Sequence, residues 1–315
     1  MNKTPLLSIC IPTYNRGEIL AKNLDTYVND PAFDNRVEIV ISDNFSSDCT
    51  EELISKFSKK YKNIIYKRLN RNIGGDLNYN TVLSMGNGLY LKLMNDTVTL
   101  NPGMMSYMLD VICSKKKYMD PIFFYQNITF LNLNKILRLS NLNELVSNVS
   151  FHITWIANFG IWRRDFQLLE DKDRYAHLQF VQVDWTIRIF NKNSFCNIYY
   201  GEYYNVSDLK EKGGYNVFKT FAINYLSLYD EYLKTRQLKK KIYNKEKYRL
   251  MRHLLFGLYR KLVLSEQESL IFEKDNAIKL LMKNYRYHSY FYIGIIFSRF
   301  FQILEKIKKF QLKKY

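Results

Sequence analysis

The chain has 315 residues, of which 47% are hydrophobic and 24% are charged, and this ordinary globular usage excludes a mostly disordered chain. Its four cysteines lie far apart in the sequence, which excludes a disulfide framework and a zinc ribbon and indicates reduced, cytosolic thiols. The apolar runs are too short for a signal peptide or a spanning helix, so we expect neither.

The charge is strongly basic and unevenly distributed. There are 47 Lys and Arg residues against 30 Asp and Glu residues, a net charge of +17. Residues 1–204 hold 23 basic and 20 acidic residues (+3), whereas residues 205–315 hold 24 and 10 (+14). The basic third predicts a polyanionic partner, either an anionic lipid surface or nucleic acid. A compositional bias towards lysine is the alternative, although such a bias would raise lysine throughout the chain.

The first hundred residues alternate between strand and helix patterns. Apolar runs predict strands at residues 6–15, 37–43, 63–69 and 89–96. Helical periodicity and helix-start signals predict helices at residues 18–28, after 48, at 76–85 and after 102. Such alternation predicts a parallel sheet with helices on both faces, whose ligands bind beyond the carboxyl ends of the strands. The polar segments there are residues 13–15, 43–44, 70–75 and 95–97.

The rest of the chain changes in character along its length. Residues 121–130 and 195–206 have strand patterns, and residues 179–190 have a helix pattern. After the Gly213-Gly214 pair, nearly everything reads as helix, at residues 218–233, 245–262, 266–283 and 290–309.

Four ordered motifs resemble the opening of family 2 glycosyltransferases with a GT-A fold. They are SICIPTYNR at residues 8–16, EIVISDN at 38–44, SSD at 46–48 and NRNIGGD at 70–76. The resemblance covers about residues 5–235, and the first 105 residues carry most of it. The surroundings of Gly213-Gly214 are similar to abequosyltransferase-like enzymes of bacterial surface polysaccharides.

This resemblance implies an α/β fold of the GT-A type, a Rossmann-like, mostly parallel sheet with helices on both faces, followed by a C-terminal helical region. It implies a glycosyltransferase domain at residues 1–235, with a nucleotide-sugar half at 1–105 and an acceptor half at 106–235. Residues 236–315 would form the basic helical region.

The donor implied by the resemblance is a nucleotide diphosphate sugar. Asp43, at a strand end, would accept a hydrogen bond from a base N–H, and Tyr14 would offer an aromatic face to the base or ribose. An Asx turn and simple packing are the respective alternatives. Gly74 would allow the backbone to approach the donor closely. The other donor-binding candidates are Pro12, Asn15, Asn72, Asp76, Asn95 and Asp96.

Family members commonly hold Mn²⁺ or Mg²⁺ on an acidic run that follows a strand, and the metal neutralises charge on the leaving diphosphate. Asp96 matches the first acidic position and is the metal candidate, but Val98 occupies the last one. The site is therefore weakened, and we expect at most partial metal dependence. Thr97, Asn95 or another carboxylate could compensate, as could basic residues acting without a metal.

The resemblance also implies a general base for inverting transfer. Asp184 matches the family's aspartate at the start of a helix, with Val183 in place of the usual Glu. The alternative is a helix-surface ion pair between Asp184 and Arg188 at i,i+4. His177 is the second base candidate. The acceptor-binding candidates are Trp155, Trp162 and Arg163, for which burial in a strand is the alternative.

The resulting functional prediction is an inverting glycosyltransferase that moves a sugar from a nucleotide diphosphate sugar to a hydroxyl of a glycan or lipid-linked glycan. The product would be capsule, O-antigen or lipooligosaccharide. A degenerate, non-catalytic protein that binds sugar nucleotides is the alternative, suggested by Val98 and Val183. Only charge suggests a nucleic-acid binder, and because no nucleic-acid-binding motif is present we expect no nucleic acid partner.

Residues 290–309 are aromatic and aliphatic and then become basic. This pattern predicts an interfacial helix on an anionic surface, and thus a cytoplasmic protein peripheral to the inner face of the cytoplasmic membrane. Packing on the domain core, or on a second subunit in a homodimer, is the alternative.

Overall fold

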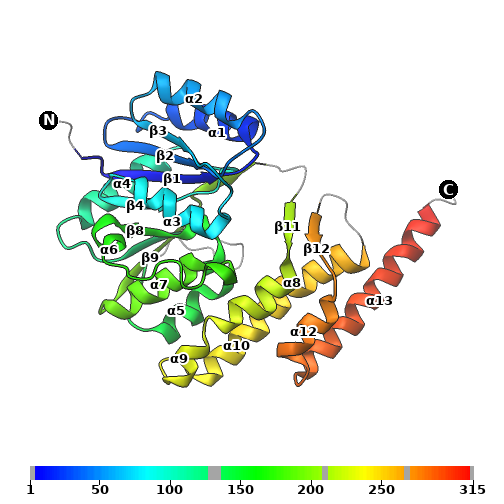
Figure 1. Ribbon diagram of the computed structural model, residues 1–315. Helices are drawn as coiled ribbons and strands as arrows, with labels where there is room; N and C mark the ends of the chain where they lie inside the picture. The colour runs from blue at the N-terminus through cyan, green and yellow to red at the C-terminus, as the bar shows by residue number, and fades with distance from the viewer. Residues whose placement is uncertain (1–3, 127–135, 208–211, 266–269, 313–315) are drawn as a thin grey trace. The chain divides into compact units, whose positions relative to one another are not determined.

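A computed structural model describes residues 4–126, 136–207, 212–265 and 270–312 (Figure 1). The chain divides into two compact units. Unit 1 comprises Met1–Glu144 and His152–Asp208, and unit 2 comprises Leu145–Phe151 and Leu209–Tyr315. The contact boundary thus lies at residue 208, whereas the sequence places the end of the glycosyltransferase domain at 235. That functional extent stays a prediction, because compactness does not define which residues act in catalysis.

The central sheet of unit 1 has five strands in the order β3-β2-β1-β4-β8. They are β3 (Ile64–Arg68), β2 (Val37–Asp43), β1 (Leu7–Thr13), β4 (Tyr90–Leu93) and β8 (Gly160–Trp162). The first four are mutually parallel, and only β8 runs antiparallel, against β4. The predicted mostly parallel sheet is confirmed.

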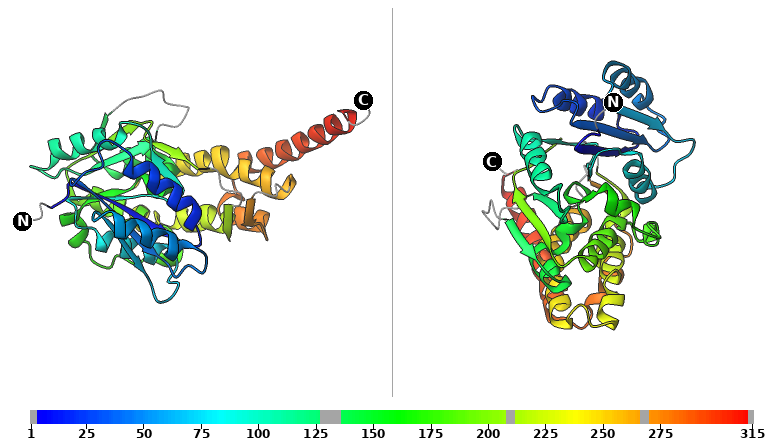
Figure 2. Two further views of the ribbon diagram at one scale, coloured as in Figure 1. Left: turned by 90° about the horizontal axis from the view of Figure 1, so that it is seen from above. Right: turned by 90° about the vertical axis from the view of Figure 1, so that its left-hand side faces the viewer.

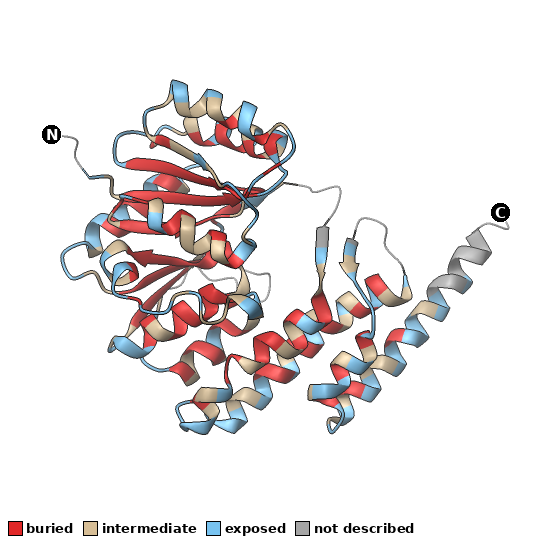
Figure 3. Cartoon of the chain, viewed as in Figure 1, coloured by how far each residue is buried: buried red, intermediate tan, exposed pale blue. Residues whose placement is uncertain are grey.

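Helices cover both faces of this sheet. Ile9 and Ile39 belong to one core cluster together with residues of α1 (Gly17–Val28) and α4 (Met104–Lys115). Side chains of the opposite parity face α3 (Gly75–Met85), where the Ser42 hydroxyl donates to Asn78 at 2.6 Å. Figure 3 shows β1 and β2 buried along their lengths. Each fully buried Ile contributes about 1.5–3 kcal/mol relative to exposure, so the apolar strands stabilise the frame of the site.

Further elements complete unit 1. A three-stranded sheet has the order β6-β9-β7, and β10 pairs antiparallel with β5. These elements are β5 (Val98–Leu100), β6 (Ile122–Gln126), β7 (Ile136–Leu139), β9 (Cys196–Gly201), β10 (Tyr204–Val206), α2 (Thr50–Lys60), α6 (Arg163–Gln167) and α7 (Val181–Lys192). Helix α5 (Leu142–Val149) runs from the residues of unit 1 into those of unit 2.

Unit 2 is mainly helical, as the sequence predicts. Its elements are β11 (Lys212–Asn216), α8 (Val217–Lys219), α9 (Asp230–Lys234), α10 (Lys240–Leu250), α11 (Phe256–Leu258), β12 (Leu270–Glu273), α12 (Ala277–Tyr285) and α13 (Ser289–Leu312). Stretches of π-helix at Thr220–Tyr225, Met251–Leu255 and Tyr259–Leu264 continue these helices. The predicted helix at 266–283 is wrong at its start, because β12 pairs with β11 there. Residues 266–269 lie outside the described residues.

Helix α13 has two different faces. Phe291 and Ser298 are buried, and Gly294 lies so close to the Phe256 ring that a Cβ atom would meet it at 1.8 Å. On the other side, Ile296 and Phe300 are 67% and 53% exposed. Figure 2 shows α13 as one continuous helix. Among the helices that the structure describes, none combines the length and apolar character needed to cross a membrane.

Candidate functional site

A pocket of about 170 Å³ opens beyond the carboxyl ends of β1, β2 and β4, where the sequence predicts ligand binding. Its lining includes four predicted donor-binding residues, Pro12, Tyr14, Asn95 and Asp96. The other residues that line it are Thr13, Arg16, Asn44, Gly75, Asn78, Tyr79 and Ile156.

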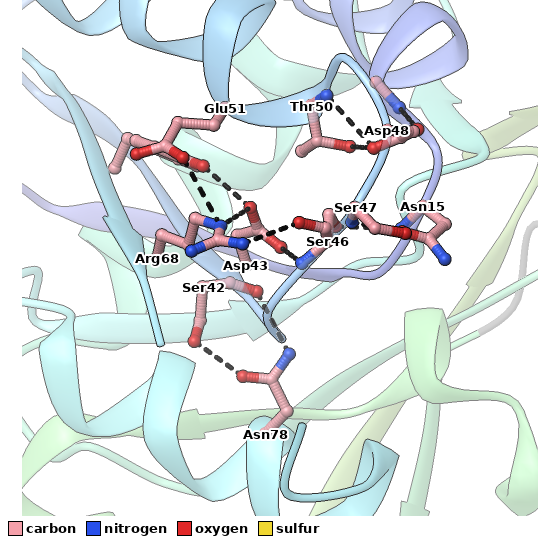
Figure 4. A network of polar contacts seen from close by, with 12 residues as sticks. Asn15, Ser42, Asp43, Ser46, Ser47, Asp48, Thr50, Glu51, Arg68 and Asn78 are labelled. Carbon is pink, nitrogen blue, oxygen red and sulfur yellow. Dashed lines mark hydrogen bonds and ion pairs between the residues drawn. The ribbon is translucent and has the colours of Figure 1, made fainter. Parts of the chain in front are cut away.

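The turn after β1 is held by Asn15. This residue has a φ of 52°, in the left-handed region that asparagine tolerates better than most residues. Its side-chain oxygen accepts from the Ser47 backbone amide at 2.8 Å, and its backbone amide donates to the Ser46 hydroxyl at 2.8 Å (Figure 4). These bonds tie the β1–α1 turn to the β2–α2 loop and leave Tyr14 46% exposed at the pocket.

Asp43 is completely buried behind this loop, and both its oxygens are engaged (Figure 4). One accepts from the Ser46 amide at 2.9 Å, and the other accepts from the Tyr66 hydroxyl at 2.7 Å. Arg68 lies 3.9 Å from the carboxylate. In this arrangement Asp43 holds the loop in place. Its predicted contact with a base stays a prediction.

The loop before α3 is joined to β2 by neutral groups. The side-chain oxygen of Asn72 accepts from the Asn44 side chain and from the Gly74 amide, both at 2.9 Å. Gly74 has a φ of +85°, which favours glycine. Apart from Gly74 and its chain neighbours, no atom of the described residues lies within 4 Å of the place where its Cβ would be, so backbone conformation rather than space restricts this position. Gly75 follows directly and lines the pocket.

Asp96 is 3% exposed and is held from two sides. Its Oδ1 accepts from Arg16 Nη1 at 2.8 Å, and its Oδ2 accepts from the Thr13 hydroxyl at 2.9 Å. The Asn23 side chain donates to its backbone carbonyl at 2.8 Å. Burial raises the pKa of the Asp96 carboxyl, and the contacts with Arg16 and Thr13 oppose that shift.

The residues here fit a divalent metal poorly. Val98, at the last position of the expected acidic run, is 2% exposed and packs in the hydrophobic core. Both carboxylate oxygens of Asp96 already have partners, one of them a guanidinium. The buried side-chain oxygen of Asn95 has no hydrogen-bond partner among the described residues and is a neutral ligand at best. Within the described ranges, no three His, Cys, Asp or Glu side chains cluster in a way that could hold a metal ion.

Asp76 lies beside the pocket at the start of α3. Its carboxylate accepts a hydrogen bond of 2.9 Å from the Val181 amide, at the first residue of α7. Burial raises the pKa of Asp76 to about 7, against the opposing effect of that amide. The side chain thus contacts a neighbouring helix, and its predicted role in donor binding remains a prediction.

Asp184 is 2% exposed in the first turn of α7. It accepts from Arg174 Nε at 3.0 Å and from Arg188 Nη1 at 3.1 Å. The ion pair between Asp184 and Arg188, the alternative to a role as base, is therefore present, and Arg174 joins it. Each oxygen of this carboxylate thus has an arginine partner. His177 is exposed in a short 3-10 helix, Ala176–Leu178, and no structural observation tests its role as a base.

The acceptor candidates lie in different places. Trp155 precedes the pocket residue Ile156, and its ring packs edge-on against Tyr204 at 5.3 Å. The roles of Trp162 and Arg163 in acceptor binding stay predictions. Because β8 runs antiparallel to β4, Trp162 pairs with Tyr90 at the amino end of β4, away from Asp96. Trp162 is also 1% exposed and donates to the Asp120 carbonyl, so its ring belongs to the core.

Several residues that line the pocket are not among the site residues predicted from the sequence. Arg16 was part of the first motif but was not chosen as a site residue, although it adjoins Asn15 in the same turn. Asn78 and Tyr79 lie one turn into α3, just after the NRNIGGD motif, and helical spacing from Gly75 could have indicated them. No local pattern would have indicated Ile156, which comes from the second half of unit 1.

Curated relatives match parts of the chain. Over 86 residues it is 45% identical to the abequosyltransferase RfbV of Salmonella typhimurium, covering 27% of this chain and 26% of that relative. Over 107 residues it is 32% identical to the GalNAc(5)-diNAcBac-PP-undecaprenol beta-1,3-glucosyltransferase of Campylobacter jejuni, covering 33% and 34%. The matched segments thus span about a third or less of these relatives.

Solved structures share the fold at low sequence identity. TarS 1-349 of S. aureus in complex with UDP-GlcNAc has a TM-score of 0.57 and 14% identity, covering 88% of this chain and 80% of that one. The mannosyltransferase PcManGT from Pyrobaculum calidifontis in complex with GDP-Man and Mn²⁺ has a TM-score of 0.55 and 12% identity, covering 96% and 88%. These likenesses confirm the predicted α/β fold of the GT-A type.

The family profile described as "Glycosyl transferase family 2" matches residues 8–188, more than half of the chain. This segment contains all four motifs and every residue that lines the pocket. The chain belongs to glycosyl transferase family 2.

Proposed function

We propose that this protein is an inverting glycosyltransferase that transfers a sugar from a nucleotide diphosphate sugar to a hydroxyl of a glycan or lipid-linked glycan. The observation that carries the proposal is the pocket at the carboxyl ends of β1, β2 and β4, where Tyr14, Arg16 and Asp96 meet. It combines an aromatic face, a cation and polar oxygen acceptors, which suit the base, the diphosphate and the hydroxyl groups of such a donor.

The donor would lie along this pocket. The half-exposed Tyr14 ring offers a face to the base or the ribose. The unpartnered Asn95 oxygen would accept a hydrogen bond from a donor hydroxyl, which would remove the cost of leaving that buried oxygen unsatisfied. Gly75 leaves room for the backbone to approach the donor. The related structures described with UDP-GlcNAc and GDP-Man support a sugar nucleotide as the ligand class.

In inverting transfer the acceptor oxygen attacks the anomeric carbon from the face opposite the diphosphate, and a base removes its proton. Asp184 is the proposed base, and Arg174 would have to swing away when the acceptor binds. Trp155, next to the pocket residue Ile156, is the proposed aromatic contact for an acceptor sugar.

The proposed pathway is the synthesis of a bacterial surface polysaccharide. One relative is named for abequosyl transfer, and another is named for a substrate carried on undecaprenol through a diphosphate. These names support a glycan or lipid-linked glycan as the acceptor of this protein. A divalent metal, present with GDP-Man in one related structure, is proposed here as at most an auxiliary.

Attachment to a membrane surface fits such an acceptor. The exposed side of α13 is apolar, with its residues spaced at three and four positions along the helix. Those 43% exposed or more are Tyr292, Ile293, Ile296, Phe297, Phe300, Phe301, Ile303, Leu304 and Ile307. The last third of the chain is also strongly basic. We propose that this side of α13 lies on the anionic inner face of the cytoplasmic membrane, with basic residues among the headgroups.

A thermal-shift screen tests the donor. UDP, CDP, GDP and dTDP, with their sugar conjugates, would each be added with and without Mn²⁺, because a ligand that binds only the folded state raises the melting temperature. A stabilising nucleotide sugar that the protein also hydrolyses or transfers supports the proposed enzyme. Stabilisation without turnover, tested against a panel of glycan acceptors, would favour the non-catalytic alternative. No stabilisation by any of these compounds would contradict donor binding.

A further inference from the structure

Arg16 and Asp96 form an ion pair at the mouth of the pocket. The Asp96 side chain is 4% exposed, whereas that of Arg16 is 42% exposed, so the carboxylate is the buried anchor and the guanidinium is its solvent-facing end. The Thr13 hydroxyl fixes the second carboxylate oxygen from the opposite side. Asp96 therefore sets the position of the guanidinium.

The guanidinium has hydrogen-bonding capacity left over. Arginine carries five N–H donors. Only Nη1 of Arg16 has a side-chain partner among the described residues, and that partner is Asp96. The remaining donors belong to a planar, permanently charged group whose geometry matches two phosphate oxygens at once. The Arg16 backbone caps α1, whose amino-terminal end adds partial positive charge at the same place.

The same contact disfavours a metal at Asp96. A divalent cation bound to Oδ1 would share that oxygen with a guanidinium 2.8 Å away, and like charges at such a distance repel. The segment after Asp96 adds no acidic side chain to offset this, because Thr97 and Val98 stand where the run would continue. The guanidinium of Arg16 already neutralises the negative charge of Asp96.

We propose, as an extension of the proposed function, that Arg16 binds the diphosphate of the donor directly and takes the place of a metal ion, with Asp96 as its positioning residue. During transfer the bond between the anomeric carbon and the diphosphate oxygen breaks, and its electron pair leaves with the diphosphate. The bond to the acceptor oxygen forms, and the acceptor proton goes to the base. Arg16 keeps its protons throughout and stabilises the charge that collects on the leaving oxygen.

The test is calorimetric binding of UDP, CDP, GDP, dTDP and inorganic pyrophosphate to the full chain, in EDTA and in Mn²⁺. The variants are Arg16→Gln and Arg16→Lys, with Arg36→Gln as the matched control. Arg36 forms an ion pair of 2.9 Å with Asp34 and is 47% exposed, so it matches Arg16 in exposure and in having a carboxylate partner, although Asp34 is itself exposed. Melting temperatures of all variants would show that they fold.

We expect wild-type affinity for the diphosphates that bind to change less than about threefold between EDTA and Mn²⁺. Arg16→Gln should lower it by about 10- to 100-fold in EDTA, the usual loss for a hydrogen bond to a charged group. The affinity of Arg16→Lys should lie between those of wild type and Arg16→Gln, since lysine keeps the charge but lacks the planar, forked arrangement of N–H donors. Arg16→Gln should also regain part of its affinity in Mn²⁺, because Oδ1 of Asp96 is then free.

Two results would overturn the inference while leaving the donor site in place. They are diphosphate binding by the wild type that requires Mn²⁺, and Arg16→Gln binding as tightly as Arg36→Gln. If none of the diphosphates binds in either medium, the donor site itself is refuted, and this inference with it.

Discussion

The Asp76 carboxylate lies 2.9 Å from the Val181 amide and joins the first turn of α3 to the first residue of α7. Helix α3 borders the proposed donor pocket, and α7 carries Asp184. This bond therefore links the segment that would bind the donor to the segment that would supply the base. Its energy depends on the protonation state of one buried carboxyl group.

Asp76→Asn should change the pH dependence of stability. Burial raises the pKa of Asp76 from 3.8 to about 7, so between these values the folded protein holds a proton that the unfolded chain releases. The contribution of Asp76 to the free energy of unfolding therefore falls as the pH rises through this window, by up to about 4 kcal/mol. Asparagine can still accept from Val181 but does not titrate. The variant should match wild type near pH 4 and exceed it at pH 8, as measured by urea unfolding.

The opposite result is informative. A variant less stable than wild type at pH 8 would mean that the two helix amino termini stabilise the ionised carboxylate more than burial penalises it.

Asp96→Ala should reduce transfer by at least about 100-fold, because Arg16 loses the contact that positions it and the Thr13 hydroxyl loses its acceptor. Donor affinity should fall by about tenfold. Turnover and calorimetry with the donor found by the screen would measure both. Asp34→Ala, which leaves a surface arginine unpaired in the same way, is the control. Unchanged turnover in Asp96→Ala would remove Asp96 from the site.

Asp184→Asn should retain the affinity for the donor within about twofold and lose turnover by about 100-fold or more, because asparagine cannot take a proton. It should also lower the free energy of unfolding by about 2 kcal/mol, since two arginines lose their shared carboxylate. That is less than for a fully buried pair, because Arg174 and Arg188 are 27% and 16% exposed.

The matched control is Asp165→Asn, which breaks the ion pair with Arg164 in the short helix α6. If Asp184→Asn is less stable but still turns over normally, then Asp184 is a structural residue and His177 is the next base to test.

A double variant of α13, Ile296→Gln with Phe300→Gln, should bind anionic liposomes weakly without loss of fold. The two side chains are exposed, so their replacement removes apolar surface without opening a cavity and leaves the net charge unchanged. Wild type should bind phosphatidylglycerol vesicles at low salt and release them at high salt, since each nearby basic residue contributes about 1 kcal/mol that salt screens.

Vesicle sedimentation measures both proteins, and Met282→Gln, at an exposed apolar position of α12, is the control. If wild type ignores the vesicles, and ultracentrifugation shows a dimer that the double variant loses, then α13 packs against a second copy.

The first hundred residues could be predicted well because local pattern and tertiary role agree there. β1 and β2 are buried at every position, and each is followed by a polar loop and an amphipathic helix. The start of the 266–283 segment was predicted as helix because its apolar residues fit that period, while β12 owes its existence to pairing with a distant strand. The position of Trp162 beside Tyr90 could not be predicted for a related reason, because nothing local reveals that β8 runs antiparallel.

The site was predictable only as far as its residues lie at strand ends. The pairing of Arg16 with Asp96 joins residues eighty positions apart, and that of Arg174 with Asp184 joins a loop to a helix. Both depend on how loops meet in space. The fold pairs Asp96 with one arginine and Asp184 with two, and of these contacts only the one between Asp184 and Arg188 is indicated by sequence spacing.

Several of the hydrogen bonds around the pocket join uncharged groups, alongside those that the Asp43 and Asp48 carboxylates accept. Asn15 binds Ser46 and Ser47, Asn44 binds Asn72, and Ser42 binds Asn78. Such bonds respond little to ionic strength or to pH near neutrality, whereas the attraction between Arg16 and a phosphate responds strongly. Higher salt should therefore weaken the proposed binding of a diphosphate while these uncharged hydrogen bonds persist. In the proposed complex, substitutions at Arg16 should therefore change the affinity for the diphosphate while the uncharged bonds between the loops remain.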